Sequence, residues 1–252
     1  MNISVVLITL NAERTLEPVL KAVSFADDIV VVDSGSTDKT KEIALKYKAR
    51  FFHQDFLGFG KQKQFAVALA KHDWVLSIDA PEVISDSLIF FLKNTLNFSQ
   101  SSYAGYSFPF INVFLGKEMS FWGSQNMSQT RLFRKSLGNY NDLSVHEKIV
   151  VNGQVHHVDY PIFHHSYENI AHYFTKFNLY TTKAAVELDK KGKKITYFAM
   201  CLRVPFKFLQ LYFLRGGFRL GWQGFFWSAF SSVYVFVKYA KLCELQNQDK
   251  FQ

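Results

Sequence analysis

The stretch Trp74-Val75-Leu76-Ser77-Ile78-Asp79-Ala80-Pro81-Glu82 indicates which class of fold this chain adopts. An apolar, partly β-branched run ends in a carboxylate, turns at a proline and meets a second carboxylate. In open α/β sheets, a strand that ends in an acid presents ligands for a metal ion or a phosphate group. The stretch therefore predicts an α/β sheet with a polar site at the carboxyl edge of its strands.

Two earlier apolar runs end in the same way. Ile3–Thr9 is followed by Asn11, and Ile29–Val32 is followed by Asp33. Asp33 alone could simply cap the next helix, but three polar strand ends in one sheet are hard to explain by capping. We expect these side chains and Asp79 to share one edge.

Strands and helices alternate over the first hundred residues. The predicted strands are Ile3–Thr9, Ile29–Val32, Ala49–His53 and Trp74–Ile78, and the predicted helices span 13–24, 37–48 and 62–70. Ser36 or Thr37 is the predicted N-cap of the second helix. Apolar strands with helices between them predict a Rossmann-like α/β fold, with a mixed, mainly parallel sheet flanked by helices. Short β-type runs between 103 and 162 predict additional antiparallel strands.

Charge divides the chain of 252 residues into two parts. Residues 1–166 contain 16 Lys+Arg and 16 Asp+Glu, whereas residues 167–252 contain 13 and 5, so the net charge of +8 lies in the last third. Cys201 and Cys243 have no metal-ligand spacing and indicate free thiols. The first residues lack a basic region and a cleavage site, which favours a strand over a signal peptide. We predict a domain over 1–166 and a basic helical region over 167–252.

Residues 196–243 combine aromatic, apolar and basic side chains. Five apolar residues recur near helical spacing: Phe198, Leu202, Phe206, Leu209 and Phe213. This composition favours helices that lie on an anionic membrane surface. A helical subdomain packed on the sheet is one alternative, and a membrane span over the uncharged run 220–237 is another, at the short limit of length. Nucleic acid is not an expected partner, because the aromatic residues fall in long apolar blocks.

Together these motifs resemble the family 2 glycosyltransferases of the GT-A fold. The matching segments are Thr9-Leu10-Asn11, Asp33-Ser34-Gly35-Ser36-Thr37-Asp38 and Asp79-Ala80-Pro81-Glu82. A closer likeness is to the subgroup that adds sugars to the lipopolysaccharide inner core. It is carried by Gly58-Phe59-Gly60-Lys61-Gln62-Lys63-Gln64-Phe65-Ala66, Val145-His146-Glu147, 203–208 and 234–241, so the resemblance covers essentially the whole chain.

The resemblance implies a site for a nucleotide-sugar donor, with a UDP-hexose as the expected donor. Six residues would form it: Asp33 on the base, Thr9 and Asn11 in the same pocket, Lys61 and Lys63 on the base or phosphates, and Asp79 on the ribose and a metal. For the two lysines, a solvated helix start is the alternative. The metal would be Mg²⁺ or Mn²⁺ bridging the diphosphate, since carboxylates suit both ions and the ion stabilises the leaving group.

Pro81 departs from the family pattern. The residue two positions after Asp79 is normally a carboxylate that binds the metal, and proline cannot coordinate an ion. Three alternatives follow: Glu82 replaces the missing ligand, the metal binds through Asp79 and His164 with more water, or metal dependence and perhaps activity are reduced. Zinc is not expected at the His-His pairs, because adjacent side chains on a strand point to opposite faces.

Glu147 matches the general base of an inverting transferase, which accepts the proton of the attacking hydroxyl. A surface acid at the start of a strand is the alternative for this residue. Arg131 and Arg134 could contact a phosphorylated acceptor, because guanidinium groups bind phosphate well. An ordinary surface position explains Arg134 equally well.

These features predict a peripheral enzyme on the cytoplasmic side of the inner membrane. It would transfer a sugar with inversion from a nucleotide sugar to a lipid-anchored saccharide acceptor, a core sugar of lipopolysaccharide. Transfer to another lipid-linked acceptor is one alternative. A catalytically silent, membrane-bound nucleotide-sugar binder is the other, and it is suggested by Pro81.

Overall fold

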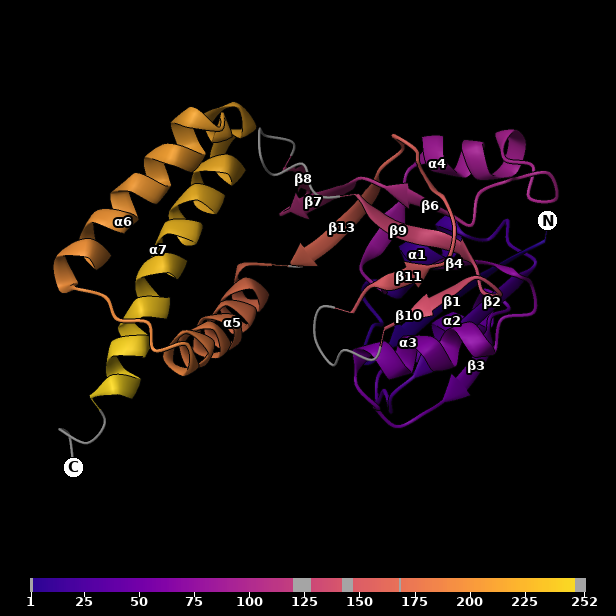
Figure 1. The fold of residues 1–252 in the computed structure, drawn as a ribbon, viewed down its shortest axis with the longest axis horizontal. Helices are drawn as coiled ribbons and strands as arrows, with labels where there is room; N and C mark the ends of the chain where they lie inside the picture. Colours follow the sequence, from indigo (N-terminus) through magenta and orange to yellow (C-terminus); the bar gives the residue numbers. More distant parts are fainter. Residues whose placement is uncertain (1, 120–127, 142–146, 168, 248–252) are drawn as a thin grey trace. The chain divides into compact units, whose positions relative to one another are not determined.

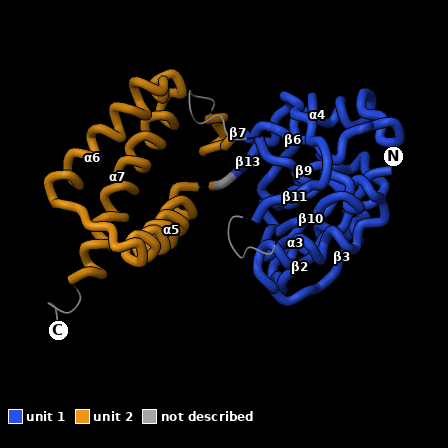
Figure 2. The backbone as a smooth tube through the Cα atoms, viewed as in Figure 1, with its two compact units in different colours: residues 1–111, 126–165 blue, residues 112–125, 166–252 orange. Residues whose placement is uncertain are grey.

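The computed structural model describes residues 2–119, 128–141, 147–167 and 169–247. The chain forms two compact units (Figure 2). Unit 1 comprises residues 1–111 and 126–165, and unit 2 comprises residues 112–125 and 166–252. The segment 112–125 therefore belongs to unit 2, although it lies inside the first 166 residues.

Unit 1 is built on a seven-stranded mixed sheet (Figure 1). In sheet order its strands are β12 (Val155–His157), β6 (Gly105–Phe108), β9 (Gln129–Arg134), β4 (Trp74–Ser77), β1 (Ile3–Thr9), β2 (Asp28–Asp33) and β3 (Arg50–His53). Four neighbouring pairs are parallel, and β9 is antiparallel to both β4 and β6. The predicted α/β fold with a mainly parallel sheet is confirmed. β12 is an exception to the expected antiparallel strands, because it runs parallel to β6.

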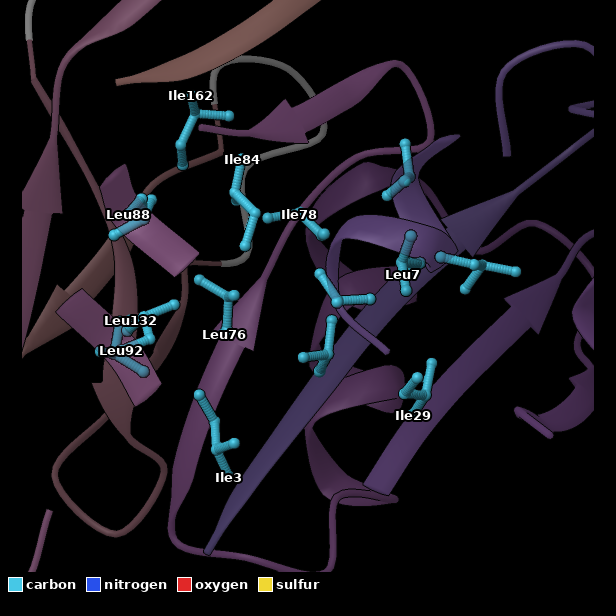
Figure 3. Packing of buried hydrophobic residues seen from close by; sticks show 14 of the residues in the cluster. Ile3, Leu7, Ile29, Leu76, Ile78, Ile84, Leu88, Leu92, Leu132 and Ile162 are labelled. Atoms are coloured by element: carbon cyan, nitrogen blue, oxygen red, sulfur yellow. The ribbon is translucent and has the colours of Figure 1, made fainter. Parts of the chain in front are cut away.

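The central strands place alternate side chains in two hydrophobic cores on opposite faces of the sheet. Val5 and Val31 lie in one core, whereas Val6 and Val30 lie in the other. The first core is covered by α1 (Leu16–Ala22), α2 (Thr40–Lys46) and α4 (Asp86–Phe90), and the second by α3 (Phe59–Ala68). Figure 3 shows the packing of aliphatic side chains in the first core. Each such side chain contributes about 1.5–3 kcal/mol by leaving water, so the cores hold the strand ends in a fixed register.

The helix predicted over 37–48 begins later, at Thr40. The predicted N-cap at Ser36 or Thr37 is wrong: the residue at this position is Lys39, which makes no side-chain capping bond. Asp38 supplies an acceptor instead, because its Oδ1 accepts from the N–H of Thr40 at 3.0 Å. Residues 34–37 form a loop after β2 rather than a first helical turn.

Two smaller strand pairs complete unit 1. β5 (Glu82–Ile84) is antiparallel to β13 (Ile162–Tyr167), and their register places His164 opposite Glu82. β10 (Gly138–Tyr140) is antiparallel to β11 (Ile149–Val151). These pairs bring the later part of the chain back to the end of β4, where Asp79 follows.

Unit 2 is mainly helical. Its long helices are α5 (Ile170–Lys190), α6 (Tyr197–Leu209) and α7 (Gly221–Gln246), and α7 packs against both others. The unit also contains the pairing of β7 (Phe110–Phe114) with β8 (Lys117–Glu118). Gly224 permits a close approach at the start of α7, since a Cβ there would lie 2.0 Å from the carbonyl oxygen of Gly217. Within the described ranges, every helix is too short or too polar to cross a bilayer.

Candidate active site

Asp33 organises the turn after β2. It lies beside Thr9 in the parallel register, and its Oδ1 accepts a hydrogen bond from the Thr9 hydroxyl at 2.8 Å. Its Oδ2 accepts from the N–H groups of Gly35 (2.9 Å) and Ser36 (2.7 Å). Burial opposes ionisation, but the bonds from Ser36 and Thr9 hold the pKa of Asp33 below its usual value. The carboxylate is therefore ionised at neutral pH and shapes this loop from within.

Asn11 joins the loops that follow β1 and β2. Its backbone has a positive φ of 49°, which asparagine tolerates better than most residues. Its N–H donates to the Ser36 hydroxyl at 2.7 Å, and its Oδ1 accepts from the N–H of Thr37 at 2.9 Å. The structure thus brings Thr9, Asn11 and Asp33 together at the carboxyl edge, as the sequence predicts.

A second group of charged residues lies beyond the end of β4, and we call it the charge cluster: Lys63, Asp79, Glu82, Arg131 and Glu147. Lys63 projects from α3, and its side chain is only 6% exposed. Its Nζ lies 2.8 Å from Oδ1 of Asp79 and 2.9 Å from Oε1 of Glu147. One ammonium group therefore holds these two carboxylates within about 6 Å of each other.

Arg131 completes the charge cluster from β9. Its Nη2 lies 2.6 Å from Oε1 of Glu82 and 3.4 Å from Oδ2 of Asp79. The second oxygen of Glu82 accepts from the backbone N–H of Asp79 at 2.9 Å. Both oxygens of Glu82 are thus engaged inside the protein, where the residue is only 3% exposed.

The charges in this cluster depend on one another. Burial disfavours the charged forms, but Lys63 and Arg131 hold the pKa of Asp79 well below its ordinary value. The charge of Asp79 likewise keeps the pKa of Lys63 above its ordinary value despite burial. Burial raises the pKa of Glu82 to about 7, with Arg131 opposing the rise and Asp79 adding to it. Asp79 and Lys63 therefore form an ion pair throughout the neutral range.

Three further residues were not identified from the sequence: Tyr140 and Ser77 beside the charge cluster, and Gln62 beside the Asp33 turn. The Tyr140 hydroxyl lies 2.8 Å from the Ser77 hydroxyl and accepts from Nη1 of Arg131 at 3.3 Å. Gln62 is fully buried and donates to the Ser34 hydroxyl at 3.1 Å. Tyr140 carries no sequence signal, because it reaches the cluster only through tertiary contacts, such as the bond from the Gln64 side chain to its carbonyl. Gln62 lies in the motif Gly58–Ala66, between Lys61 and Lys63, and only these two lysines were predicted to contact the donor.

Other predicted site residues lie apart from these groups. Lys61 is exposed in the first turn of α3. Arg134 pairs with Trp74, at the opposite end of β4, which places it about 16 Å along the strand from Asp79. It interacts with Asp73 at 3.6 Å and stacks on the ring of Trp74. Its role as an acceptor contact stays a prediction. Val145 and His146, quoted in the resemblance, lie outside the described residues.

The residues predicted to bind a metal do come close together. Asp79, Glu82 and His164 surround one turn, since His164 is opposite Glu82 in the register and Glu82 accepts from the backbone N–H of Asp79. However, Arg131 and a backbone N–H use both oxygens of Glu82, while Lys63 and Arg131 pair with Asp79. Among the described residues, there is no group of three or more acidic, histidine or cysteine side chains arranged to hold an ion. In this arrangement the site does not fit a divalent metal.

An α/β domain with ionised carboxylates at the carboxyl edge of parallel strands has the architecture of proteins that bind nucleotides there. The family comparison defines the class further. The chain belongs to glycosyl transferase family 2, whose family model matches residues 4–152. It is therefore a glycosyltransferase.

Relatives cover nearly the full chain. An uncharacterised glycosyltransferase of Rickettsia typhi is 30% identical over 96% of this chain and 87% of its own length. The lipopolysaccharide core biosynthesis glycosyltransferase LpsC of Rhizobium meliloti is 30% identical over 95% of this chain and 91% of its own length. Glucosyl-3-phosphoglycerate synthase from Mycobacterium tuberculosis, solved with Mn²⁺, UDP and phosphoglyceric acid, has a TM-score of 0.47 and 18% identity. That likeness covers 77% of this chain and 80% of the solved one.

Proposed function

We propose that this glycosyltransferase moves a sugar from a nucleotide-sugar donor, a UDP-hexose, to a core sugar of lipopolysaccharide, with inversion and with Glu147 as general base. The observation that carries the proposal is the position of Lys63, which contacts Asp79 and Glu147 at once. An acid at the end of β4 and the candidate base are thereby held within one small volume. This proximity suits a donor on one side and an acceptor hydroxyl on the other.

In the proposed reaction, the acceptor hydroxyl attacks the anomeric carbon from the face opposite the diphosphate. The new C–O bond forms while the bond from the anomeric carbon to the diphosphate oxygen breaks. The electron pair of the broken bond leaves with the nucleoside diphosphate, and the hydroxyl proton passes to Glu147. Thr9, Asn11 and Asp33 would hold the nucleotide, and Lys61 would contact it from the start of α3.

The proposed acceptor rests on the likeness to LpsC and on the surface of unit 2. The α6 stripe comprises the exposed residues Phe198, Leu202, Phe206, Leu209 and the nearby Phe213. Lys207 is on the same helix, and burial together with the charges of Arg215 and Lys238 lowers its pKa. Apolar side chains beside clustered cations suit an anionic lipid surface. We therefore propose a peripheral position at the cytoplasmic face of the inner membrane, where a lipid-anchored acceptor is accessible.

The proposed base can be tested with Glu147→Gln. Removing the proton acceptor should lower kcat by about 10²- to 10⁴-fold and leave donor affinity nearly unchanged. Glu42→Gln is the control, because Glu42 is exposed on α2. Equal turnover by wild type and Glu147→Gln would rule out this base. NMR of the product would report the anomeric configuration, and retention would contradict a single inverting step.

A panel of acceptors distinguishes the proposed substrate from its alternatives. Turnover with purified lipopolysaccharide core, but not with a polyprenyl-phosphate sugar, would support the proposal. The opposite preference would identify a different lipid-linked acceptor. Donor binding without turnover on any acceptor would favour a silent nucleotide-sugar binder.

A further inference from the structure

We infer that Lys63 and Arg131 take the place of the divalent ion in this transferase, so that the donor binds and reacts without a metal. The inference rests on the proposed function, since it concerns the same site. It begins with the balance of charge. Asp79, Glu82 and Glu147 contribute three carboxyl groups, and Lys63 and Arg131 bring two cations within 2.6–3.4 Å of them. Each cation therefore already has carboxyl partners inside the protein.

A divalent ion performs two tasks in this kind of transfer. It compensates the carboxylates that face the diphosphate, and it stabilises negative charge on the leaving group. In this chain, the first task is already fulfilled by Lys63 and Arg131. A metal that displaced them from Asp79 and Glu82 would leave Arg131 without a carboxylate and Lys63 with Glu147 alone. Removing the partner of a buried charge is strongly unfavourable.

The same two cations are suited to the second task. Lys63 has three N–H donors, and among the described residues Asp79 and Glu147 accept two of them, which leaves one for a diphosphate oxygen. Nε of Arg131 is buried and has no hydrogen-bond partner within the described part of the chain. An unused donor is satisfied by an oxygen acceptor and not by a cation. The Lys63 ammonium therefore has a donor for an anionic group, whereas the enclosed Arg131 contributes its positive charge.

The replacement at Pro81 agrees with this arrangement. The Pro81 carbonyl accepts from the N–H of His165 at 2.8 Å, and the N–H of Glu82 donates to the Asp79 carbonyl at 2.8 Å. These bonds fix the turn while the Glu82 side chain engages Arg131. Glu82 thus positions the arginine and is not free to substitute for the ligand missing at residue 81. Of the three alternatives raised by the sequence, the geometry favours reduced metal dependence.

The decisive measurement uses the full-length wild-type protein and Mn²⁺ alone. Electron paramagnetic resonance of added Mn²⁺ should detect no specific site in the absence of donor. UDP-glucose and other UDP-hexoses should then bind with affinities that differ by less than about threefold between EDTA and Mn²⁺. Calorimetry provides these affinities, and turnover in EDTA should remain within about threefold of turnover in Mn²⁺.

Lys63→Met provides the complementary test. Loss of the ammonium frees Asp79 and Glu147, so this variant should acquire a Mn²⁺ signal. Its donor affinity in EDTA should fall by about tenfold or more and recover in part with Mn²⁺. Lys21→Met is the matched control, because Lys21 is exposed on α1 and should behave as wild type.

The outcomes separate this inference from the proposed function. A specific Mn²⁺ site in the wild type would overturn the inference whether or not a donor binds. Donor binding that is lost in EDTA would overturn it as well, while leaving the proposed function intact. A wild type that binds no UDP-sugar with or without metal would contradict the proposed donor. The Mn²⁺ measurement would still decide the metal question, even if Lys63→Met failed to fold.

Discussion

Nη2 of Arg131 lies 2.6 Å from Oε1 of Glu82, and both side chains are buried. Breaking a buried ion pair from one side leaves an uncompensated charge. We therefore expect Arg131→Met to lower the free energy of unfolding by about 3–5 kcal/mol. The double variant Arg131→Met/Glu82→Leu should lose less than Arg131→Met alone, because it removes both charges. Urea denaturation of the three proteins measures this difference.

Arg134→Met is the matched control for stability. This arginine lies on the same strand, but its side chain is 27% exposed and its partner Asp73 is 3.6 Å away. Removing it should cost about 1 kcal/mol or less. Equal losses for the two single arginine variants would contradict the assignment of Arg131 to a buried ion pair.

Gly35 gives a test of the Asp33 turn. Its φ of +100° is strained for any residue with a Cβ, although the nearest atom to such a Cβ would be 3.8 Å away. Gly35→Ala should therefore destabilise the fold by about 1–2 kcal/mol through backbone strain, without a clash. Its N–H donates to Asp33, so a shifted turn should also weaken donor binding. Thermal unfolding and calorimetry measure the two effects.

Gly58→Ala is the control that distinguishes general backbone strain from an effect of the Asp33 turn on donor binding. Gly58 has a similar φ of +94°, and nothing would lie within 4 Å of its Cβ. The cost in stability should be comparable to that of Gly35→Ala, but among the described residues the Asp33 carboxylate accepts from Thr9, Gly35 and Ser36 and not from Gly58. If Gly58→Ala weakened donor binding as much as Gly35→Ala, the effect could not be assigned to the Asp33 turn.

Much of the fold follows from local patterns. The run Ile3–Thr9 was predicted with its observed bounds, because an uninterrupted apolar segment between polar ends specifies a strand buried on both faces. The start of α2 at Thr40 was not predicted. Residues 34–37 form a loop instead of a helical turn, and bonds from Asn11 to Ser36 and from Thr37 to Asn11 connect this loop to the one after β1. Neither segment alone encodes these bonds.

The candidate site shows the same contrast. Acids at strand ends identified Asp33 and Asp79, since their positions follow from the strands themselves. The contact of Lys63 with Glu147 joins residues 84 positions apart, and only the tertiary fold brings them together. Because they are close in sequence, Arg131 and Arg134 received the same predicted role. In the structure Arg131 is buried beside Glu82, whereas Arg134 is partly exposed beside Asp73 at the other end of β4.

Asp28 should make the free energy of unfolding depend on pH in the acid range. Its carboxylate pairs with Arg50 at 2.9 Å and accepts from the Lys71 N–H at 2.8 Å. Burial opposes ionisation, but the bonds from Arg50 and Ser4 hold its pKa below the ordinary value of 3.8. The stabilisation is therefore fully present above about pH 4 and is lost as the pH falls through the lower folded-state pKa. Acid titrations of the unfolding free energy should show a smaller loss for Asp28→Asn than for wild type.

At neutral pH, Asp28→Asn should itself be less stable than wild type by about 2–4 kcal/mol, because Arg50 loses its partner. The two proteins should therefore converge in stability toward low pH. If the difference in unfolding free energy between the two proteins stayed constant as the pH fell, the assigned role of Asp28 would be contradicted.

The α6 stripe should control binding to anionic membranes. Phe206 is 65% exposed, and transfer of such a side chain from water to lipid contributes about 1.5–3 kcal/mol. Phe206→Asp should therefore reduce co-sedimentation with phosphatidylglycerol vesicles by about tenfold or more. Phe90→Asp is the control, because Phe90 is 64% exposed but lies on α4 of unit 1. Salt should weaken the binding that remains, since the cations near Lys207 also contribute. If Phe206→Asp and Phe90→Asp reduced vesicle binding equally, or if neither changed it, the α6 stripe would be excluded as the lipid-contacting surface.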